Sequence, residues 1–448
     1  MACLFLGLLV LWAPVIYGSV LPRERLVLIL LSLAGITALF MTREPSVWRP
    51  AWPALVPAAV ALLGLAQSLP WPPFLANFLA PSVAASWRQQ EPNGWLPLSL
   101  APEVSRGNAA LWLSVAAVFA SATVLSRHRP ARRCLAVTVA LAATFQLAYG
   151  AQKHLSQGRE VWGYTVEFDR LHGTFVNPDR FATFLLMLLA VCFSWSWWSI
   201  RRATFSSRAE RRLAYFALPL FVFTLLFAAL ALTGSRGGLL GAGAGLFFQT
   251  LALFFYTRRW QTGALGLLTA VLGMGGLFYL NSTRSLSRWA ETSAFDLTVN
   301  NRLEVYALTF GLWQEAPWTG TGLATFRQAF PAVQPADLER TWIHAHNNYL
   351  EILATTGLVG LAVVVLGIVA VVLRLVRNLR RGRRSEDRAV ALAALGAMAA
   401  VGVHEMVDFG LALPANAFFM ALILGAGCGV PVFERPETDS DQPNDENA

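Results

Sequence analysis

The chain has 448 residues, of which 56% are hydrophobic and only 14% are charged, and its mean hydropathy is +0.51. An average soluble domain has roughly 25% charged residues, so this composition excludes an ordinary soluble protein and indicates a polytopic membrane protein. The net charge of +9 is not accompanied by a basic face interleaved with exposed aromatic residues, and we therefore expect no binding of nucleic acid.

Twelve apolar runs along the chain predict transmembrane helices. A helix needs roughly 20 apolar residues to cross a hydrocarbon core of about 30 Å, and only the second run is clearly short. The runs are 3–20, 26–41, 52–69, 107–125, 134–151, 181–200, 213–233, 237–256, 262–280, 349–373, 389–407 and 410–430. The first run has neither a basic start nor a clear small-x-small cleavage site, so we expect a retained helix. The sequence thus predicts an all-α membrane domain over 1–433.

The basic residues favour one orientation in the membrane. If the amino terminus is cytoplasmic, 21 of the 35 basic residues fall in short inner segments, and membrane proteins carry such an excess in their cytoplasmic loops. We therefore expect both termini inside and three long loops outside, at 70–106, 152–180 and 281–348. The tail 434–448 is acidic with almost nothing apolar, and we expect it to be disordered in the cytoplasm.

The first two outer loops contain different signals. Loop 70–106 is rich in Pro and Trp, which is typical of a structural cover at the headgroup level. Loop 152–180 ends in Gly-Thr-Phe-Val-Asn-Pro at 173–178, where Asn-Pro indicates a turn and Pro178 can begin the next helix. Two interpretations of Asn177 stay open: it starts a helix, or it also shapes a pocket.

A short outer connection holds an arginine against the charge bias of the other short connections. Its sequence is Thr-Gly-Ser-Arg-Gly-Gly at 233–238. The glycines beside Arg236 let a backbone approach a ligand closely. We therefore favour a functional role for Arg236 over an arginine that only extends to the membrane interface.

The largest outer loop, 281–348, has balanced charge, so any anion site in it must be local. Apolar residues at helical spacing from Asn300 to Trp313 predict an amphipathic helix along the outer surface. Arg302 is expected in its first turn, where the helix dipole also attracts anions. The loop ends in His-Ala-His-Asn-Asn-Tyr at 344–349, so two side chains that exchange protons near neutral pH lie at the membrane edge.

Two further patterns carry weaker signals. Pro-Trp-Thr-Gly-Thr-Gly at 317–322 lacks the strand and the Gly-Lys-Ser/Thr of a phosphate-binding loop, and we interpret it as a turn. His404 and Asp408 are four residues apart and are expected to share a helix face near the outer end of the eleventh span. A local pair is favoured over a metal site, because no third ligand is evident.

The run His346-Asn347, followed after nine residues by Gly357-Leu358-Val359-Gly360, resembles the hallmark of the O-antigen ligase and O-antigen or exopolysaccharide polymerase superfamily. Segments 173–178 and 233–238 are similar to that family's Gly-Thr-Phe-x-Asn-Pro and Thr-x-Ser-Arg-Gly-Gly motifs. With one large outer loop before the histidine, the resemblance covers roughly residues 140–430. Segment 407–417 looks more like the closing motif of the exopolysaccharide polymerases, which leaves the acceptor open between lipid A core and a growing chain.

The resemblance implies a C-type, all-helical membrane glycosyltransferase. Such an enzyme takes a glycan from undecaprenyl diphosphate at the periplasmic face of the bacterial inner membrane, without a metal ion or other cofactor, and its partners are the lipid-linked glycan, an acceptor glycan or lipid A core, and membrane lipids. In the family two arginines bind the diphosphate and a histidine activates the acceptor. Arg236, Arg302 and His346 occupy these catalytic positions. His344, Asn177 and Asn347 are further candidates for substrate binding.

The chemistry of these residue types fits such a transfer. Two guanidinium groups can stabilise a departing diphosphate by forked hydrogen bonds, and an imidazole with a pKa near 6.5 can accept the acceptor's proton at neutral pH. Backside attack would invert the anomeric centre.

The main alternative is a polytopic transporter or flippase of lipid-linked glycans, since twelve spans is also a common carrier count. Carriers usually have two similar halves, whereas this sequence has no evident internal repeat. A purely structural membrane protein is a third option, which the arginine in the outer turn disfavours.

Overall fold

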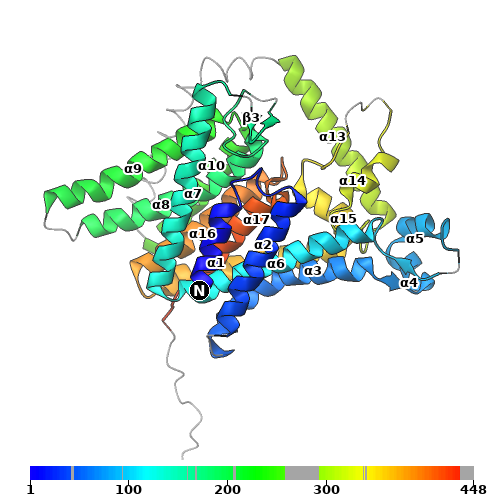
Figure 1. Cartoon of the computed structure of the whole chain (residues 1–448), viewed down its shortest axis with the longest axis horizontal. Helices are drawn as coiled ribbons and strands as arrows, with labels where there is room; N and C mark the ends of the chain where they lie inside the picture. Colours follow the sequence, from blue (N-terminus) through cyan, green and yellow to red (C-terminus); the bar gives the residue numbers. More distant parts are fainter. Residues whose placement is uncertain are drawn as a thin grey trace, which may run out of the picture.

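The structure is a computed structural model in which residues 1–41, 45–92, 94–158, 160–166, 169–204, 208–257, 292–336, 338 and 341–433 are described. It is built from helices (Figure 1). In the first half they are α1 (Ala2–Trp12), α2 (Pro22–Phe40), η1 (Pro45–Ala54), α3 (Leu55–Ser68), α4 (Pro73–Leu79), α5 (Pro81–Arg88), α6 (Pro102–Ser126), α7 (Arg129–Leu155) and α8 (Pro178–Ala203). In the second half they are α9 (Ala209–Leu232), α10 (Arg236–Thr257), α13 (Thr292–Glu315), α14 (Phe326–Ala329), η2 (Phe330–Ala332), α15 (Asn348–Arg381), α16 (Ser385–His404), η3 (Gly410–Ala412) and α17 (Pro414–Gly429).

In the part of the chain that the structure describes, the strands form two short antiparallel pairs in the expected outer loops. β1 (Pro70–Trp71) pairs with β2 (Leu96–Pro97), and β3 (Glu160–Val161) pairs with β4 (Tyr164–Thr165). The first pair and the short helices α4 and α5 form one end of the molecule (Figure 1). The expected cover at 70–106 is therefore a folded element.

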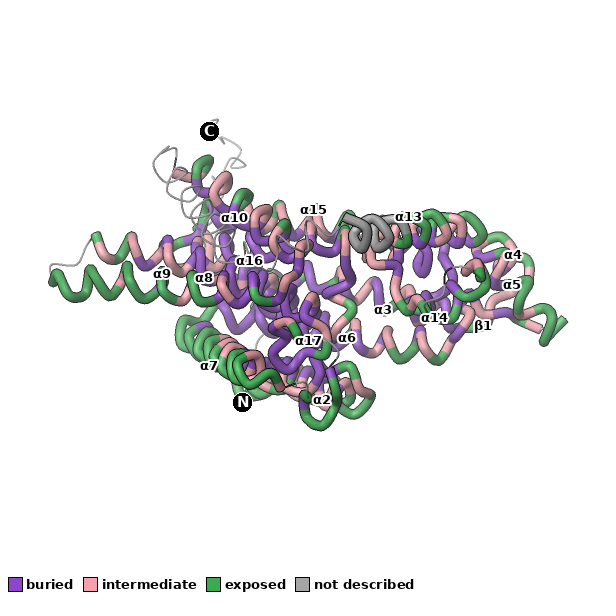
Figure 2. Tube along the Cα trace, turned by 90° about the horizontal axis from the view of Figure 1, so that it is seen from above, coloured by how far each residue is buried: buried purple, intermediate pink, exposed green. Residues whose placement is uncertain are grey.

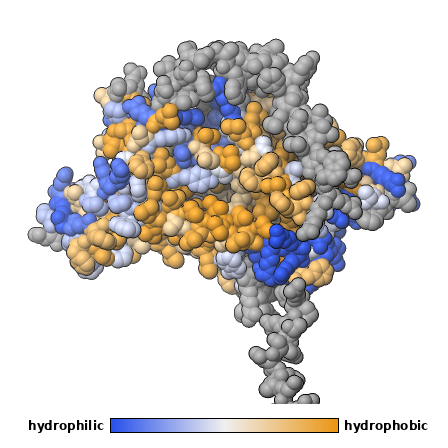
Figure 3. All heavy atoms as spheres, turned by 180° about the vertical axis from the view of Figure 1, so that it is seen from behind, coloured by the Kyte–Doolittle hydropathy of each residue, from blue (hydrophilic) through white to orange (hydrophobic). Residues whose placement is uncertain are grey.

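Within the described residues, eight helices are long and apolar enough to cross a membrane, and α1 and α17 are shorter apolar helices. Apolar side chains cover the middle of the face in Figure 3, and α9 and α10 expose large ones such as Phe216, Phe221 and Phe255. The chain is an all-α polytopic membrane protein, as its composition predicts. The count of twelve spans stays a prediction, because the expected span 262–280 lies outside the described residues, as does the tail 434–448.

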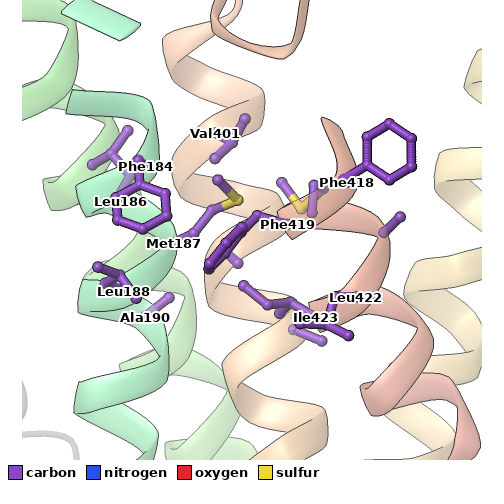
Figure 4. Packing of buried hydrophobic residues seen from close by; sticks show 14 of the residues in the cluster. Phe184, Leu186, Met187, Leu188, Ala190, Val401, Phe418, Phe419, Leu422 and Ile423 are labelled. Carbon is purple, nitrogen blue, oxygen red and sulfur yellow. The ribbon is translucent and has the colours of Figure 1, made fainter. Parts of the chain in front are cut away.

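The centre of the molecule is formed by α6, α8, α16 and α17. Burial is concentrated there, while α7 and α9 expose long faces (Figure 2). Between α8, α16 and α17 the buried side chains interdigitate (Figure 4), and the rings of Phe184 and Phe419 meet edge to face with centroids 4.7 Å apart. Such aromatic pairs contribute about 0.5–1.5 kcal/mol beyond the area that they bury. This core fixes the helices whose ends carry the polar residues.

The first and last predicted spans are not continuous helices. The run 3–20 is not one helix: α1 ends at Trp12, ahead of Pro14, and Tyr17 and Ser19 then adopt positive φ angles. The run 410–430 begins with the short η3, and the regular helix α17 begins only at Pro414. Proline suits the first position of a helix because its missing N–H needs no partner there. Hydrophobicity predicted these segments but not where each backbone turns.

The tenth predicted span, 349–373, falls within α15, whose helix is broken at Gly357. This residue has φ 64° and ψ −167°, a combination that is essentially restricted to glycine. The break exposes peptide groups that pair with the turn at 317–322: the N–H of Leu358 donates to the carbonyl of Pro317 at 2.9 Å, and the N–H of Gly322 donates to the carbonyl of Thr355 at 2.9 Å. The turn predicted at 317–322 thus exists and fills the gap in α15.

We expect Gly357→Ala to destabilise the protein by more than the roughly 1–3 kcal/mol of a strained backbone conformation. A Cβ atom at this position would lie 2.3 Å from the carbonyl carbon of Trp318, and backbone cannot move away as a flexible side chain can. Thermal unfolding of the purified variant in detergent measures the effect. The matched control is Gly107→Ala in α6, where an added Cβ meets nothing within 4 Å and alanine favours the helix by about 0.5–1 kcal/mol. Equal melting temperatures for the two variants would contradict the proposed role of Gly357.

Candidate active site

Several helix ends meet at one end of the bundle. The N–H of Asn348, at the start of α15, donates to the carbonyl of Glu405 just after α16 at 2.9 Å. A Cβ atom at Gly237, at the start of α10, would lie 3.0 Å from the ring of His404. Arg180, near the start of α8, pairs with Asp408 in the turn after α16. The starts of α8, α10 and α15 therefore surround the segment between α16 and α17.

The opposite ends of α8 and α15 are basic. α8 has Arg201 and Arg202 in its last turn, and α15 has Arg380 and Arg381. The polar cluster at the helix starts and the arginine-rich helix ends are thus separated by the length of the spans.

The asparagines singled out in the sequence are helix caps. The side chain of Asn177 accepts from the N–H of Asp179 at 2.8 Å at the start of α8, and that of Asn347 accepts from the N–H of Leu350 at 3.1 Å at the start of α15. Such caps satisfy backbone N–H groups that a helix start leaves unpaired. Both residues therefore cap the start of a helix. Their role in substrate binding remains a prediction.

His346 precedes the cap of α15 and has an unusual backbone. Its φ is 55°, in the left-handed region that few non-glycine residues adopt. The hydroxyl of Tyr306 donates to its carbonyl at 2.9 Å. Its ring meets those of Trp342 and Phe409 edge to face, with centroid distances of 5.5 and 5.0 Å. Strained backbone conformations of this kind cluster at functional sites.

A single carboxylate holds the loop that contains both histidines. Nδ1 of His344 donates to Oε1 of Glu351 at 2.8 Å, and the N–H of Ala345 donates to Oε2 at 2.9 Å. The ring of His344 also stacks on Phe409 at 3.9 Å between centroids. Glu351 lies in the first turn of α15, so its carboxylate attaches the histidine loop to the start of that helix.

Asp408 is the centre of a buried ionic cluster. Its Oδ2 pairs with Nη1 of Arg180 and lies 3.7 Å from Nε2 of His404, while its Oδ1 lies 3.7 Å from Nδ1 of His346. Burial alone would raise the pKa of Asp408, but the adjacent Arg180 guanidinium outweighs it and holds that pKa well below the usual range of an aspartate. Asp408 therefore stays negatively charged.

The predicted pair of His404 and Asp408 exists, although not on one helix face. α16 ends at His404, and Asp408 lies in the turn beyond it. Among the residues that the structure describes, no group of three or more His, Cys, Asp or Glu side chains is placed to hold a metal ion. His404 instead lies 3.1 Å from the hydroxyl of Thr183 through Nδ1.

Arg302 reaches the same turn from α13. Its Nη1 donates to the carbonyl of Val407 at 3.4 Å, and Tyr306 follows one turn later on the same side of the helix. A helix is present where the sequence predicts one, but α13 begins at Thr292, and it also exposes large apolar side chains such as Leu303 and Phe310. The expectation that Arg302 lies in the first turn is therefore wrong. Because the effect of the helix dipole is limited to the first turn, the dipole does not attract an anion to Arg302.

Arg236 approaches from α10. It is the first residue of that helix and is half-buried. The hydroxyl of Ser235 accepts from the N–H of Gly238 at 3.1 Å and fixes the helix start. A Cβ atom at Gly237 would lie 2.8 Å from the side chain of Val407, so only a small residue lets α10 approach this closely. Arg236 and Arg302, which are far apart in the sequence, thus belong to segments that both contact Val407.

The environment of His346 keeps its imidazole neutral at pH 7. Burial lowers the pKa of His346 below its ordinary value, the Asp408 carboxylate raises it, and the guanidinium groups of Arg302 and Arg180 lower it. The net direction is downward. An unprotonated imidazole can accept a proton, so the geometry provides a base beside two cationic side chains.

Three residues at this site were not assigned there from the sequence. Arg180 was visible as a charged residue in the first turn of an apolar span, where ionisable groups usually face the protein interior. Glu351 is likewise a charged residue in the first turn of an apolar span. Asp408 was assigned to His404 alone, and no pattern in the sequence connects it to His346 or Arg180.

Comparison with known families covers the central part of this site. No curated protein matches the chain. Residues 221–365 match the family model described as O-antigen ligase, a segment that runs from α9 into α15 and contains Arg236, Arg302 and His346. This match supports membership of the chain in the superfamily of O-antigen ligases and polymerases.

Proposed function

We propose that this protein is a glycosyltransferase of the ligase or polymerase type. It transfers an oligosaccharide or polysaccharide from undecaprenyl diphosphate to an acceptor hydroxyl, at the periplasmic face of the bacterial inner membrane. The observation that carries this proposal is the convergence of α10, α13 and the His346 loop on the segment after α16, within a chain that carries the O-antigen ligase family segment.

In the proposed reaction the acceptor oxygen attacks the anomeric carbon opposite the diphosphate. The bond between that carbon and the diphosphate oxygen breaks, and its electron pair leaves with the diphosphate. Arg236 and Arg302 stabilise the increasing negative charge by charge-assisted hydrogen bonds, so we propose that no metal ion is required. His346 accepts the proton of the acceptor hydroxyl. A single displacement of this kind inverts the anomeric centre.

The charge distribution supports the proposed orientation. The arginines in the last turns of α8 and α15 lie at the ends opposite the site, and basic residues favour the cytoplasmic side. A site at the other end then faces the periplasm, with both termini in the cytoplasm. Asn177, His344 and Asn347 lie at or beside helix starts around the cluster, which is the basis for proposing them as contacts of the bound glycan.

A reconstituted reaction tests the proposed function. Purified protein in lipid vesicles is incubated with undecaprenyl diphosphate-linked repeat units, with and without lipid A core, in the presence of EDTA. We expect transfer under these conditions: a ladder of longer glycans without core indicates a polymerase, and core capped with glycan indicates a ligase. Absence of both products from correctly inserted protein would contradict the function, and transport of intact donor would favour a flippase.

A further inference from the structure

The carboxylate of Asp408 lies beside the imidazole of His346, and the proposed reaction assigns it no role. Nδ1 of His346 is buried and makes no hydrogen bond to any described residue, while Oδ2 of Asp408 is paired with Arg180. Buried polar atoms without partners are uncommon in proteins and indicate a site of strain or function. The imidazole Nδ1 and the carboxylate Oδ1 are 3.7 Å apart, and a small rotation of the ring brings them within the 2.7–3.2 Å or so of a hydrogen bond.

The surroundings hold the carboxylate in place and keep it charged. Arg180 pairs with Asp408 on one side, and its guanidinium carbon lies 3.1 Å from the centre of the Phe409 ring. Asn416, fully buried in α17, donates to the carbonyls of Arg180 and Gly410 at 3.1 and 3.0 Å. These contacts tie the start of α8 to the turn that contains Asp408. Catalytic hydrogen bonds commonly shorten when substrate binds.

We propose that Asp408 is the positioning residue for His346: it accepts a hydrogen bond from Nδ1, fixes the tautomer, and leaves Nε2 to accept the proton of the acceptor hydroxyl. An ionised carboxylate on one ring nitrogen also stabilises the imidazolium that forms when the other nitrogen gains a proton, as in other acid–base pairs. Arg180 in turn keeps Asp408 ionised. The catalytic effect of Asp408 rests on the proposed function. The hydrogen bond between Asp408 and His346 can be observed without any glycan transfer.

The first test is Asp408→Asn, which removes the charge and keeps the shape. We expect the maximal rate of transfer to fall by at least about tenfold, and by no more than the roughly 10²–10⁴-fold that the general base itself contributes, while KM for the lipid-linked donor changes little. The acid limb of the pH–rate profile should move to lower pH. The charged groups that act on His346 are Asp408, Arg302 and Arg180, and loss of the carboxylate leaves only the two cations. A rate that falls without movement of the acid limb would assign Asp408 a merely structural role.

The matched control is Asp179→Asn. Asp179 is also paired with an arginine, Arg170, at 3.2 Å, and it lies next to Arg180 in sequence. We expect its replacement to leave the acid limb in place. An equal shift in both variants would contradict a specific effect of Asp408.

A second measurement does not depend on activity. Full-length protein labelled with ¹⁵N-histidine in lipid nanodiscs should give a His346 signal, identified by its loss in His346→Gln, with the proton on Nδ1. Asp408→Asn should lose this preference. Because Asp408→Asn leaves Arg180 buried without its anion, the double variant Arg180→Gln with Asp408→Asn provides a neutral pair if the single variant fails to fold, and it should lose the preference too.

The two proposals fail in different ways. An Nε2 proton on wild-type His346, or an unchanged tautomer in the variants, would overturn the positioning role whether or not transfer is observed. Wild-type protein that shows the Nδ1 proton but no transfer with any donor would retain the His346–Asp408 pair and overturn the proposed function.

Discussion

Replacing His346 with alanine is expected to reduce glycan transfer by about 10²–10⁴-fold, the usual contribution of a general base. The side chain removed is a half-buried imidazole beside Arg302 and Asp408. Initial rates of transfer from the lipid-linked donor by purified protein in vesicles measure the loss. Donor binding should persist, because the arginines remain.

The pH dependence of the wild-type enzyme provides a second check on His346. Burial lowers the pKa of His346, so the imidazole is unprotonated at neutral pH and becomes protonated only below the roughly 6.5 of a free histidine. Transfer should therefore stay constant from pH 7 to about 6.5 and decline at lower pH as His346 gains its proton. This acid limb should be absent from the residual activity of His346→Ala.

His154→Ala is the control for a histidine removed elsewhere. His154 lies in the last turn of α7, outside the cluster around Asp408. We expect wild-type rates from this variant. Near-normal transfer by His346→Ala would remove the assignment of this residue as the base, while leaving the family match of residues 221–365 untouched.

Arg236→Ala and Arg302→Ala are each expected to lower the rate by about 10²–10³-fold, the effect of removing one donor that stabilises developing charge in a transition state. Each arginine belongs to a segment that contacts Val407, which is the basis for proposing that one diphosphate at this turn meets both guanidinium groups. Rates at saturating donor measure the loss. Arg236→Lys should also fail, since lysine supplies a point charge without the planar fork that binds two phosphate oxygens.

The control for the loss of a positive charge is Arg327→Ala. Arg327 is exposed on the short helix α14 in the same outer loop as Arg302, and its removal should leave the rate unchanged. All variants should insert normally, which chromatography in detergent can verify. A fully active Arg236→Lys would show that a simple positive charge is sufficient, and a fully active Arg302→Ala would remove this residue from diphosphate binding.

Local patterns in the sequence identified most of the helices and the family motifs. Apolar runs predicted the described spans because a helix that faces lipid must be hydrophobic over its whole length. The motif around His346 included Gly357, and the structure gives the physical reason: the backbone breaks there in a conformation that glycine alone adopts readily. The start of α13 was missed although Phe295, Val299 and Leu303 continue the helical spacing toward the amino terminus.

The sequence by itself determined that this is a helical membrane protein with two arginines and a histidine on its predicted outer segments. Only the tertiary structure decided the partners of these side chains. Asp408 was matched with His404, four residues away, because helix geometry makes such pairs visible, whereas its contacts with Arg180 and His346 join parts of the chain far apart in sequence. Hydrophobic periodicity reports which face of a helix is buried, and it carries no information on which distant helix end will pack against it.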